Sequence, residues 1–193
     1  MYEEDEPVCI CPNMTDTNIE FVEAIRVYYT KEPSYFENNK FKHYCNCAIA
    51  LGVNNIVMIL EQMMLLDYLI LNHDRHFKNF GILRDSQTLK IIGAAPVFDN
   101  GSSLFHEDRA DAIKLPEKPK MRSECFDTLD NQLKLIKDWS WFNGLKLEGI
   151  SAISKELLLS VDSVEKKRAE KIADVLEKRI ETAHLTSLQT GIC

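Results

Sequence analysis

Three polar residues, Asp74, Asn79 and Asp99, have the side-chain types and the spacing that phosphoryl transfer from a nucleotide requires. That chemistry needs a carboxylate to orient the acceptor hydroxyl, oxygen ligands for Mg2+, and a frame that holds both. Asp74 and Asn79 lie in the string NHDRHFKNFGI with a D-x4-N spacing, which is typical of catalytic loops in phosphotransferases. The spacing predicts Asp74 as the catalytic base and Asn79 as a metal ligand.

Asp99 lies in a second loop, within the string PVFDNGSSL. Asp99, Asn100 and Gly101 have the D-x-G form of a metal-binding loop, in which Gly101 is free to adopt a positive φ angle. The 25-residue separation between Asp74 and Asp99 is enough for one β-hairpin. Such a hairpin would return the chain, so we expect Asp99 to meet Asn79 at one Mg2+ site.

Two elements are expected to position these loops. The segment 56–72 is apolar on nearly every face, which indicates a helix in the centre of a helical domain. Residues 80–85 and 89–93 have the pattern of two short strands joined by a turn. The sequence therefore predicts a mainly α-helical fold in which a small β-hairpin carries the catalytic and metal-binding loops.

Capping residues and helix-breaking residues indicate where the other helices, strands and loops begin and end. The sequence predicts a strand at 6–13, helices at 14–29, 35–51, 127–138, 147–159 and 163–184, and an exposed loop at 108–122. In the last helix, Val164, Ile172, Val175, Leu176 and Ile180 should face the core, and we assign Met63, Met64, Trp139, Trp141 and Phe142 to the core as well.

Composition excludes several classes of protein. The length of 193 residues suits one domain, and 45% hydrophobic with 27% charged residues is ordinary for a globular chain. A net charge of −7 argues against direct binding of nucleic acid, since phosphate contacts need clustered Lys and Arg. The beginning MYEEDEP lacks the features of a signal peptide, and Glu61 and Asp67 interrupt the longest apolar run. We therefore expect a cytoplasmic protein with no membrane association.

Six cysteines include two C-x-C pairs, one of which, Cys45 and Cys47, lies near His43. Structural zinc sites usually use wider C-x2–4-C spacings, so reduced thiols are the favoured interpretation over zinc. Ser102 and Ser103 follow the metal loop and are interpreted as turn residues, with phosphorylation of an activation segment as the alternative.

Arg75 and His76 extend the first loop to D-R-H-x-x-N. Through DYLILNHDRHFKNFGILRD and AAPVFDNGSSLF, the sequence resembles the HipA-like serine/threonine kinases. Phosphoinositide kinases share the D-R-H-x-x-N string, but the small size and acidic composition favour the HipA-like family. The resemblance implies that Asp74 is the catalytic carboxylate and that Asn79 and Asp99 bind Mg2+.

The resemblance implies further roles. Arg75 and His76 would brace the loop, and His76 could also contact phosphate. Lys78 could neutralise charge on the transferred phosphoryl group, with an ordinary surface lysine as an equal alternative. The implied cofactors are ATP and Mg2+, and the implied substrate is a serine or threonine hydroxyl of a protein.

Two parts of a whole kinase do not occur in the sequence: a glycine-rich loop over the phosphates and a strand lysine ahead of the catalytic loop. We therefore interpret residues 1–15 as the last strand and hinge of a missing N-lobe, and residues 16–193 as a kinase C-lobe. Asn13 lies in the hinge and would bind the cofactor.

This interpretation predicts weak nucleotide binding and little turnover by the chain alone. Three explanations fit the missing lobe: a truncated product, one half of a split kinase, or a degenerate protein. The expected partner is an N-lobe polypeptide or an antitoxin-like protein. The alternative is a non-catalytic interaction module or pseudokinase fragment.

Overall fold

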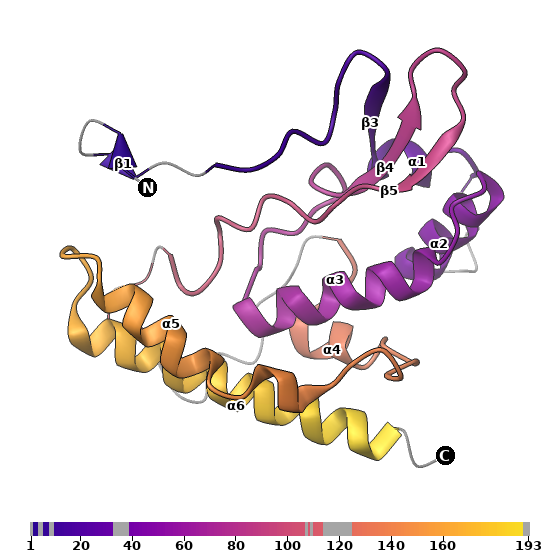
Figure 1. The fold of residues 1–193 in the computed structure, drawn as a ribbon. Coiled ribbons are helices and arrows are strands. Elements are labelled where there is room, and N and C mark those ends of the chain that lie inside the picture. Colours follow the sequence, from indigo (N-terminus) through magenta and orange to yellow (C-terminus); the bar gives the residue numbers. More distant parts are fainter. Residues whose placement is uncertain are drawn as a thin grey trace.

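The computed structural model describes residues 2–3, 6–7, 10–32, 39–106, 108, 110–113 and 125–190. Its elements are β1 (Tyr2–Glu3), β2 (Glu6–Pro7), β3 (Ile19–Glu23), α1 (Ala24–Tyr28), α2 (Lys40–Ala50), α3 (Ile56–Ile70), β4 (Gly81–Asp85), β5 (Ile91–Ala94), α4 (Leu129–Leu133), the 3-10 helix η1 (Gly144–Leu147), α5 (Ile150–Leu159) and α6 (Lys166–Thr190). Figure 1 shows α3 between the β3–β4–β5 sheet on one side and the paired helices α5 and α6 on the other.

The predicted hairpin forms from β4 and β5, and β3 pairs with the other edge of β4, so the sheet is antiparallel in the order β3-β4-β5. Gly81 lies opposite Glu23, where the two strands approach closely. A Cβ at Gly81 would overlap the Val22 carbonyl oxygen and lie 2.9 Å from the Phe21 ring. Only glycine fits this position, which directly follows the catalytic loop.

The prediction of a single helix over 14–29 is wrong for its first part. Ile19–Glu23 is strand β3, and only Ala24–Tyr28 is helical. The segment IEFVE has β-branched and aromatic residues, and its pattern of apolar residues fits the periodicity of a helix as well as that of a strand. Pairing with β4 therefore decides its conformation.

The predicted strand at 6–13 is correct only at its start. Glu6–Pro7 pairs with Tyr2–Glu3, whereas residues 10–13 are not in a strand, and residues 8 and 9 lie outside the described residues. The N-lobe interpretation of residues 1–15 therefore stays a prediction.

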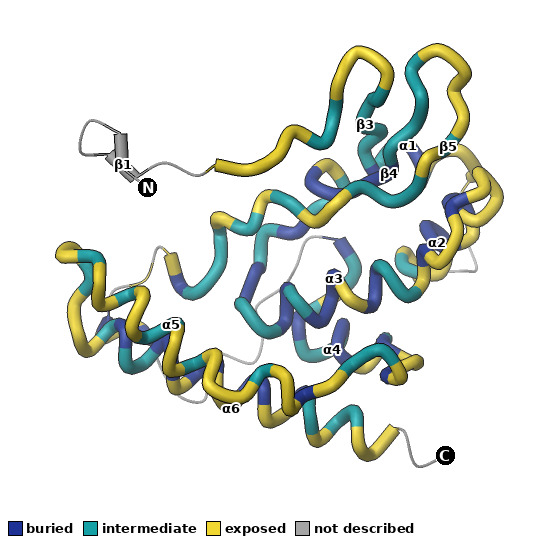
Figure 2. The backbone as a smooth tube through the Cα atoms, viewed as in Figure 1, coloured by how far each residue is buried: buried dark blue, intermediate teal, exposed yellow. Residues whose placement is uncertain are grey.

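The core has two hydrophobic clusters that meet along α3. One joins α1, α2 and the sheet, and the other joins α3, α4 and α6. Figure 2 shows buried residues along α3 and exposed residues along α5. The predicted core residues Met63, Met64, Ile172 and Trp139 are buried, which confirms the inward face of α6 and the central place of α3.

The other residues that the sequence assigned to the core are either buried or half-buried. Val175, Leu176 and Ile180 are also buried, whereas Trp141 and Phe142 are half-buried against the second cluster, and Val164 is half-buried.

Part of the segment predicted as an exposed loop at 108–122 is held against α6. Ala110 and Ile113 are buried, and Lys171 Nζ donates to both of their carbonyl oxygens, at 2.5 and 2.8 Å. Arg168 donates to the Phe105 carbonyl oxygen at 2.7 Å. Residues 107, 109 and 114–124 lie outside the described residues.

Among the described residues, no helix is both long and apolar enough to cross a bilayer. Cys45, Cys47 and Cys125 are buried free thiols, and Cys11 is an exposed one. Within the same part of the chain, no group of three or more His, Cys, Asp or Glu side chains is arranged to hold a metal ion.

Candidate active site

The catalytic loop begins where α3 ends. Leu71 has a positive φ of 55° and a fully buried side chain, so burial holds a backbone conformation that leucine rarely adopts. The amide of Asn72 then donates to the Asp67 carbonyl oxygen at 2.9 Å. This αL turn stops the helix and sends the chain into the loop that carries Asp74.

Arg75 connects the helix, the catalytic loop and the metal loop. Its Nε and one terminal nitrogen bind the two carboxylate oxygens of Asp67, each at 2.9 Å, and both side chains are fully buried. The other terminal nitrogen donates to the carbonyl oxygens of Asn79, at 2.9 Å, and Phe98, at 2.7 Å. A further contact reaches Asn100 Oδ1 at 2.6 Å. The guanidinium of Arg75 thus holds Phe98 and Asn100 next to its own loop, although they lie 23 and 25 positions further along the sequence.

Asn72 completes the surroundings of Asp67. Its Nδ2 donates to Asp67 Oδ1 at 3.0 Å, and its Oδ1 accepts from the Asp74 amide at 3.2 Å. Burial raises the pKa of the Asp67 carboxyl, while hydrogen bonds and charge from Arg75, with the amide of Asn72, act against the rise. The backbone of Asp74 is therefore tied to a buried ion pair.

Asn79 lies between Asp74 and Asp99. Its Oδ1 accepts from the His76 amide at 3.0 Å, and its Nδ2 donates to the Asp74 carbonyl oxygen at 3.0 Å. The same Nδ2 lies 3.4 Å from Asp99 Oδ2. The hairpin thus brings together the two residues that the sequence assigned to one metal. In this loop Asp99 has a positive φ of 57°, and Gly101 does not use its freedom to adopt one.

The Asp74 carboxylate is half-buried and faces the metal loop. Ser102 Oγ donates to Asp74 Oδ2 over a long 3.4 Å. The neighbouring Ser103 Oγ is buried and has no hydrogen-bond partner among the described residues. A hydroxyl group can therefore approach the carboxylate that the sequence assigns as the base.

Asn79 and Asp99 fit a divalent cation by their chemistry. Asn79 Oδ1 accepts one hydrogen bond and keeps a second lone pair, and the Asp99 side chain is exposed. Mg2+ prefers oxygen ligands and usually takes only one or two protein groups besides water and phosphate oxygens. The two residue types fit this requirement, but Asn79 is only 2% exposed and presents its Nδ2 rather than its Oδ1 to Asp99.

The other residues that the sequence assigned to the site, His76, Lys78 and Asn13, make different contacts. His76 Nδ1 accepts from the Lys78 amide at 3.2 Å, so this ring contributes to the loop conformation. The Lys78 side chain is exposed, and both residues line a depression of about 310 Å³. Asn13 is exposed and bonds with Thr15, and among the described residues no contact joins it to Asp74, Asn79 or Asp99.

Aromatic rings anchor the underside of the catalytic loop. Phe77 contacts the rings of Tyr28, Tyr44, Phe80 and Phe126, with centroids 5.2 to 6.1 Å apart. The loop is also tied to the start of α1, whose first amides donate to the carbonyl oxygens of Phe80 and Phe77 at 2.9 and 2.8 Å. Packing on one side and Arg75 on the other thus hold the loop in place, while the side chains of Lys78 and Asp99 stay exposed.

Three residues with a part in this arrangement were not assigned from the sequence: Asp67, Asn72 and Asn100. Asp67 was visible only as a charge that interrupts an apolar helix. A carboxylate there requires a buried partner, because burying an unpaired charge is costly. The need for a buried partner to Asp67 was the sequence signal that could have identified the role of Arg75.

No protein-family model matches this sequence, and no curated protein matches it significantly. Among solved structures, the fold is similar to that of the Helicobacter pylori proinflammatory kinase CtkA, with a TM-score of 0.62 and 15% sequence identity. The match covers 93% of this chain and 75% of that one. The chain therefore has a kinase-like fold, mainly helical with a small three-stranded antiparallel sheet.

Proposed function

We propose that the chain transfers the γ-phosphoryl group of ATP to a serine or threonine hydroxyl of a protein, as the C-lobe of a HipA-like kinase. The carrying observation is the contact between Asn79 and Asp99, made next to Asp74 although 20 residues separate the two in sequence. The kinase-like fold supports ATP as the donor. The D-R-H-x-x-N string supports the HipA-like assignment.

In this proposal, Asp74 orients the acceptor hydroxyl and takes its proton as the oxygen bonds to the γ-phosphorus. The bond between that phosphorus and the bridging oxygen breaks, and ADP leaves. Asn79 and Asp99 would hold Mg2+, which neutralises charge on the phosphate oxygens. Arg75 acts by positioning, because it fixes the loops of Asp74 and Asp99 against each other.

A second candidate is a non-catalytic interaction module. It is favoured by one feature of the sequence: no G-x-G-x-x-G string occurs in it, and clamping of the triphosphate supplies much of the positioning in this chemistry. An N-lobe polypeptide would supply that clamp, and an antitoxin-like protein is the other proposed partner.

Calorimetric titration with ATP separates the two candidates. The kinase proposal expects binding that depends on Mg2+ and is lost in EDTA, and it expects Asp74→Asn to keep this binding. When an N-lobe polypeptide restores phosphorylation of a serine- and threonine-containing peptide mixture, Asp74→Asn should abolish that phosphorylation. Absence of Mg2+-dependent binding at millimolar ATP would remove the enzyme proposal for this chain.

A further inference from the structure

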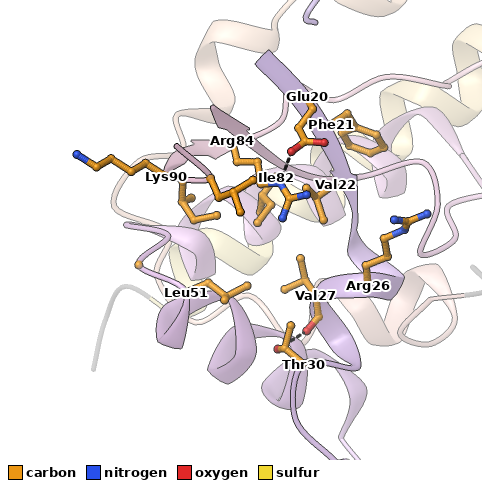
Figure 3. Close-up of a pocket in the computed structure, with 13 residues that line it drawn as sticks. Glu20, Phe21, Val22, Arg26, Val27, Thr30, Leu51, Ile82, Arg84 and Lys90 are labelled. Atoms are coloured by element: carbon orange, nitrogen blue, oxygen red, sulfur yellow. Dashed lines mark hydrogen bonds and ion pairs between the residues drawn. The ribbon is translucent and has the colours of Figure 1, made fainter. Parts of the chain in front are cut away.

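A cavity of about 710 Å³ lies between the sheet and helices α1 and α2 (Figure 3). Asp74, Asn79 and Asp99 are not among the described residues that line it. Its size falls within the roughly 300–1,000 Å³ of typical small-molecule sites. The cavity is therefore a separate place to look for a ligand.

Apolar side chains from the sheet and from the ends of the two helices form part of the cavity walls. Val22 and Ile82 are paired across β3 and β4 and lie on the same face of the sheet. Val27 of α1 and Leu51 at the end of α2 contribute the facing wall, and Ile91 of β5 extends the floor. Val27 and Ile82 are each only 1% exposed, so this wall is a fixed part of the core.

One cation reaches across the opening. Arg84 Nε lies 2.5 Å from Glu20 Oε1, and the Arg84 side chain is 35% exposed. Figure 3 shows its terminal nitrogens turned away from Glu20, toward the space between Val22 and Leu51. Among the described residues, these terminal nitrogens have no partner. Two NH2 groups are thus available at the opening of the cavity.

The charge of the lining differs from that of the whole chain. Arg26, Arg84 and Lys90 line the cavity with one carboxylate, Glu20, and Arg26 also pairs with Glu23 at 3.7 Å. Three cations thus accompany two carboxylates here, whereas the chain carries a net charge of −7. In Figure 3, Arg26 and Lys90 extend outward on opposite sides of the opening. A local excess of positive charge in an acidic protein favours an anionic ligand.

We propose that this cavity binds a small amphiphilic carboxylate. The carboxylate would accept hydrogen bonds from the terminal nitrogens of Arg84, whose planar group matches two oxygens at once. The hydrocarbon part would lie against the partly exposed side chains of Val22, Leu51 and Ile91. This proposal does not depend on the proposed kinase activity.

Calorimetry on the full chain tests the proposal with octanoate and 1-octanol as probes. Octanoate should bind saturably with one site, and octanol should bind about tenfold more weakly, the ratio that one charge-assisted interaction supplies. Arg84→Gln should weaken octanoate about tenfold and leave octanol unchanged. Lys178→Gln, at an exposed position on α6 outside the cavity, is the matched control and should bind octanoate as the original chain does.

A second variant covers the case in which Arg84→Gln unfolds. Leu51 is 38% exposed at the edge of the cavity, so Leu51→Glu should fold, as circular dichroism can check, and should weaken octanoate by repulsion. The proposal is overturned if octanoate does not saturate, if octanol binds as tightly, or if a folded Leu51→Glu variant binds octanoate unchanged.

Discussion

Arg75 and Asp67 form a two-point ion pair with both side chains fully buried, and every loop of the candidate active site is connected to it. The two nitrogen-to-oxygen distances are both 2.9 Å. Arg75 also binds the backbone of Asn79 and Phe98. The stability of the fold and the geometry of the site therefore depend on the same side chain.

Arg75→Met should destabilise the protein by about 3–5 kcal/mol, because it leaves the Asp67 carboxylate buried without its partner. The free energy of unfolding from urea titration measures this loss. Arg26→Met is the control, since its ion pair with Glu23 is 3.7 Å long and its side chain is 77% exposed. The double variant Arg75→Met with Asp67→Leu should recover part of the loss, and a loss in Arg26→Met as large as in Arg75→Met would contradict the account.

Gly81→Ala should destabilise the protein by about 1–3 kcal/mol, because its Cβ would overlap the Val22 carbonyl oxygen in the neighbouring strand. Gly93→Ala is a matched control in the same sheet, since a Cβ there has no heavy atom within 4 Å. Thermal unfolding of the two variants gives the comparison. Equal melting temperatures would show that β3 and β4 do not approach each other as described.

Cys45 and Cys11 should differ strongly in reactivity toward iodoacetamide. Burial raises the pKa of Cys45 to about 12, and Cys11 is exposed. Because the raised pKa favours the neutral thiol, only about one Cys45 in a thousand would be thiolate at pH 9, and thiolate is the reactive form. Peptide mapping by mass spectrometry should find Cys11 labelled in the native protein and Cys45 labelled only in urea. Native labelling of Cys45 at the rate of Cys11 would contradict its burial.

The central helix and the hairpin were predictable because each has a strong local pattern. Residues 56–70 are apolar over four turns, and the strands around 80–93 are short and flank a polar turn. Strand β3 was not predictable in this way, since residues 19–23 fit two periods and only their partner β4 selects one.

For the candidate site, too, the sequence predicted one part and not another. The spacing of Asp74, Asn79 and Asp99 is a sequence property, and the hairpin between them let their meeting be anticipated. The hydrogen bonds of Arg75 to Phe98 and Asn100 join positions 23 and 25 residues away, and no local pattern records them. Likewise, no local pattern in the sequence marked Asp99 as the residue of this loop with a positive φ.

The central claim, that Asn79 and Asp99 hold a divalent cation next to Asp74, is tested most directly by NMR with Mn2+ and ATP. Bound Mn2+ broadens nearby signals, so the amide signals of Asp74, Asn79 and Asp99 should broaden, while that of Lys90 should not. Asp99→Asn should abolish the effect, and Asp174→Asn, at an exposed position on α6, should preserve it. Broadening that spares the three residues, or that persists in Asp99→Asn, would contradict the account.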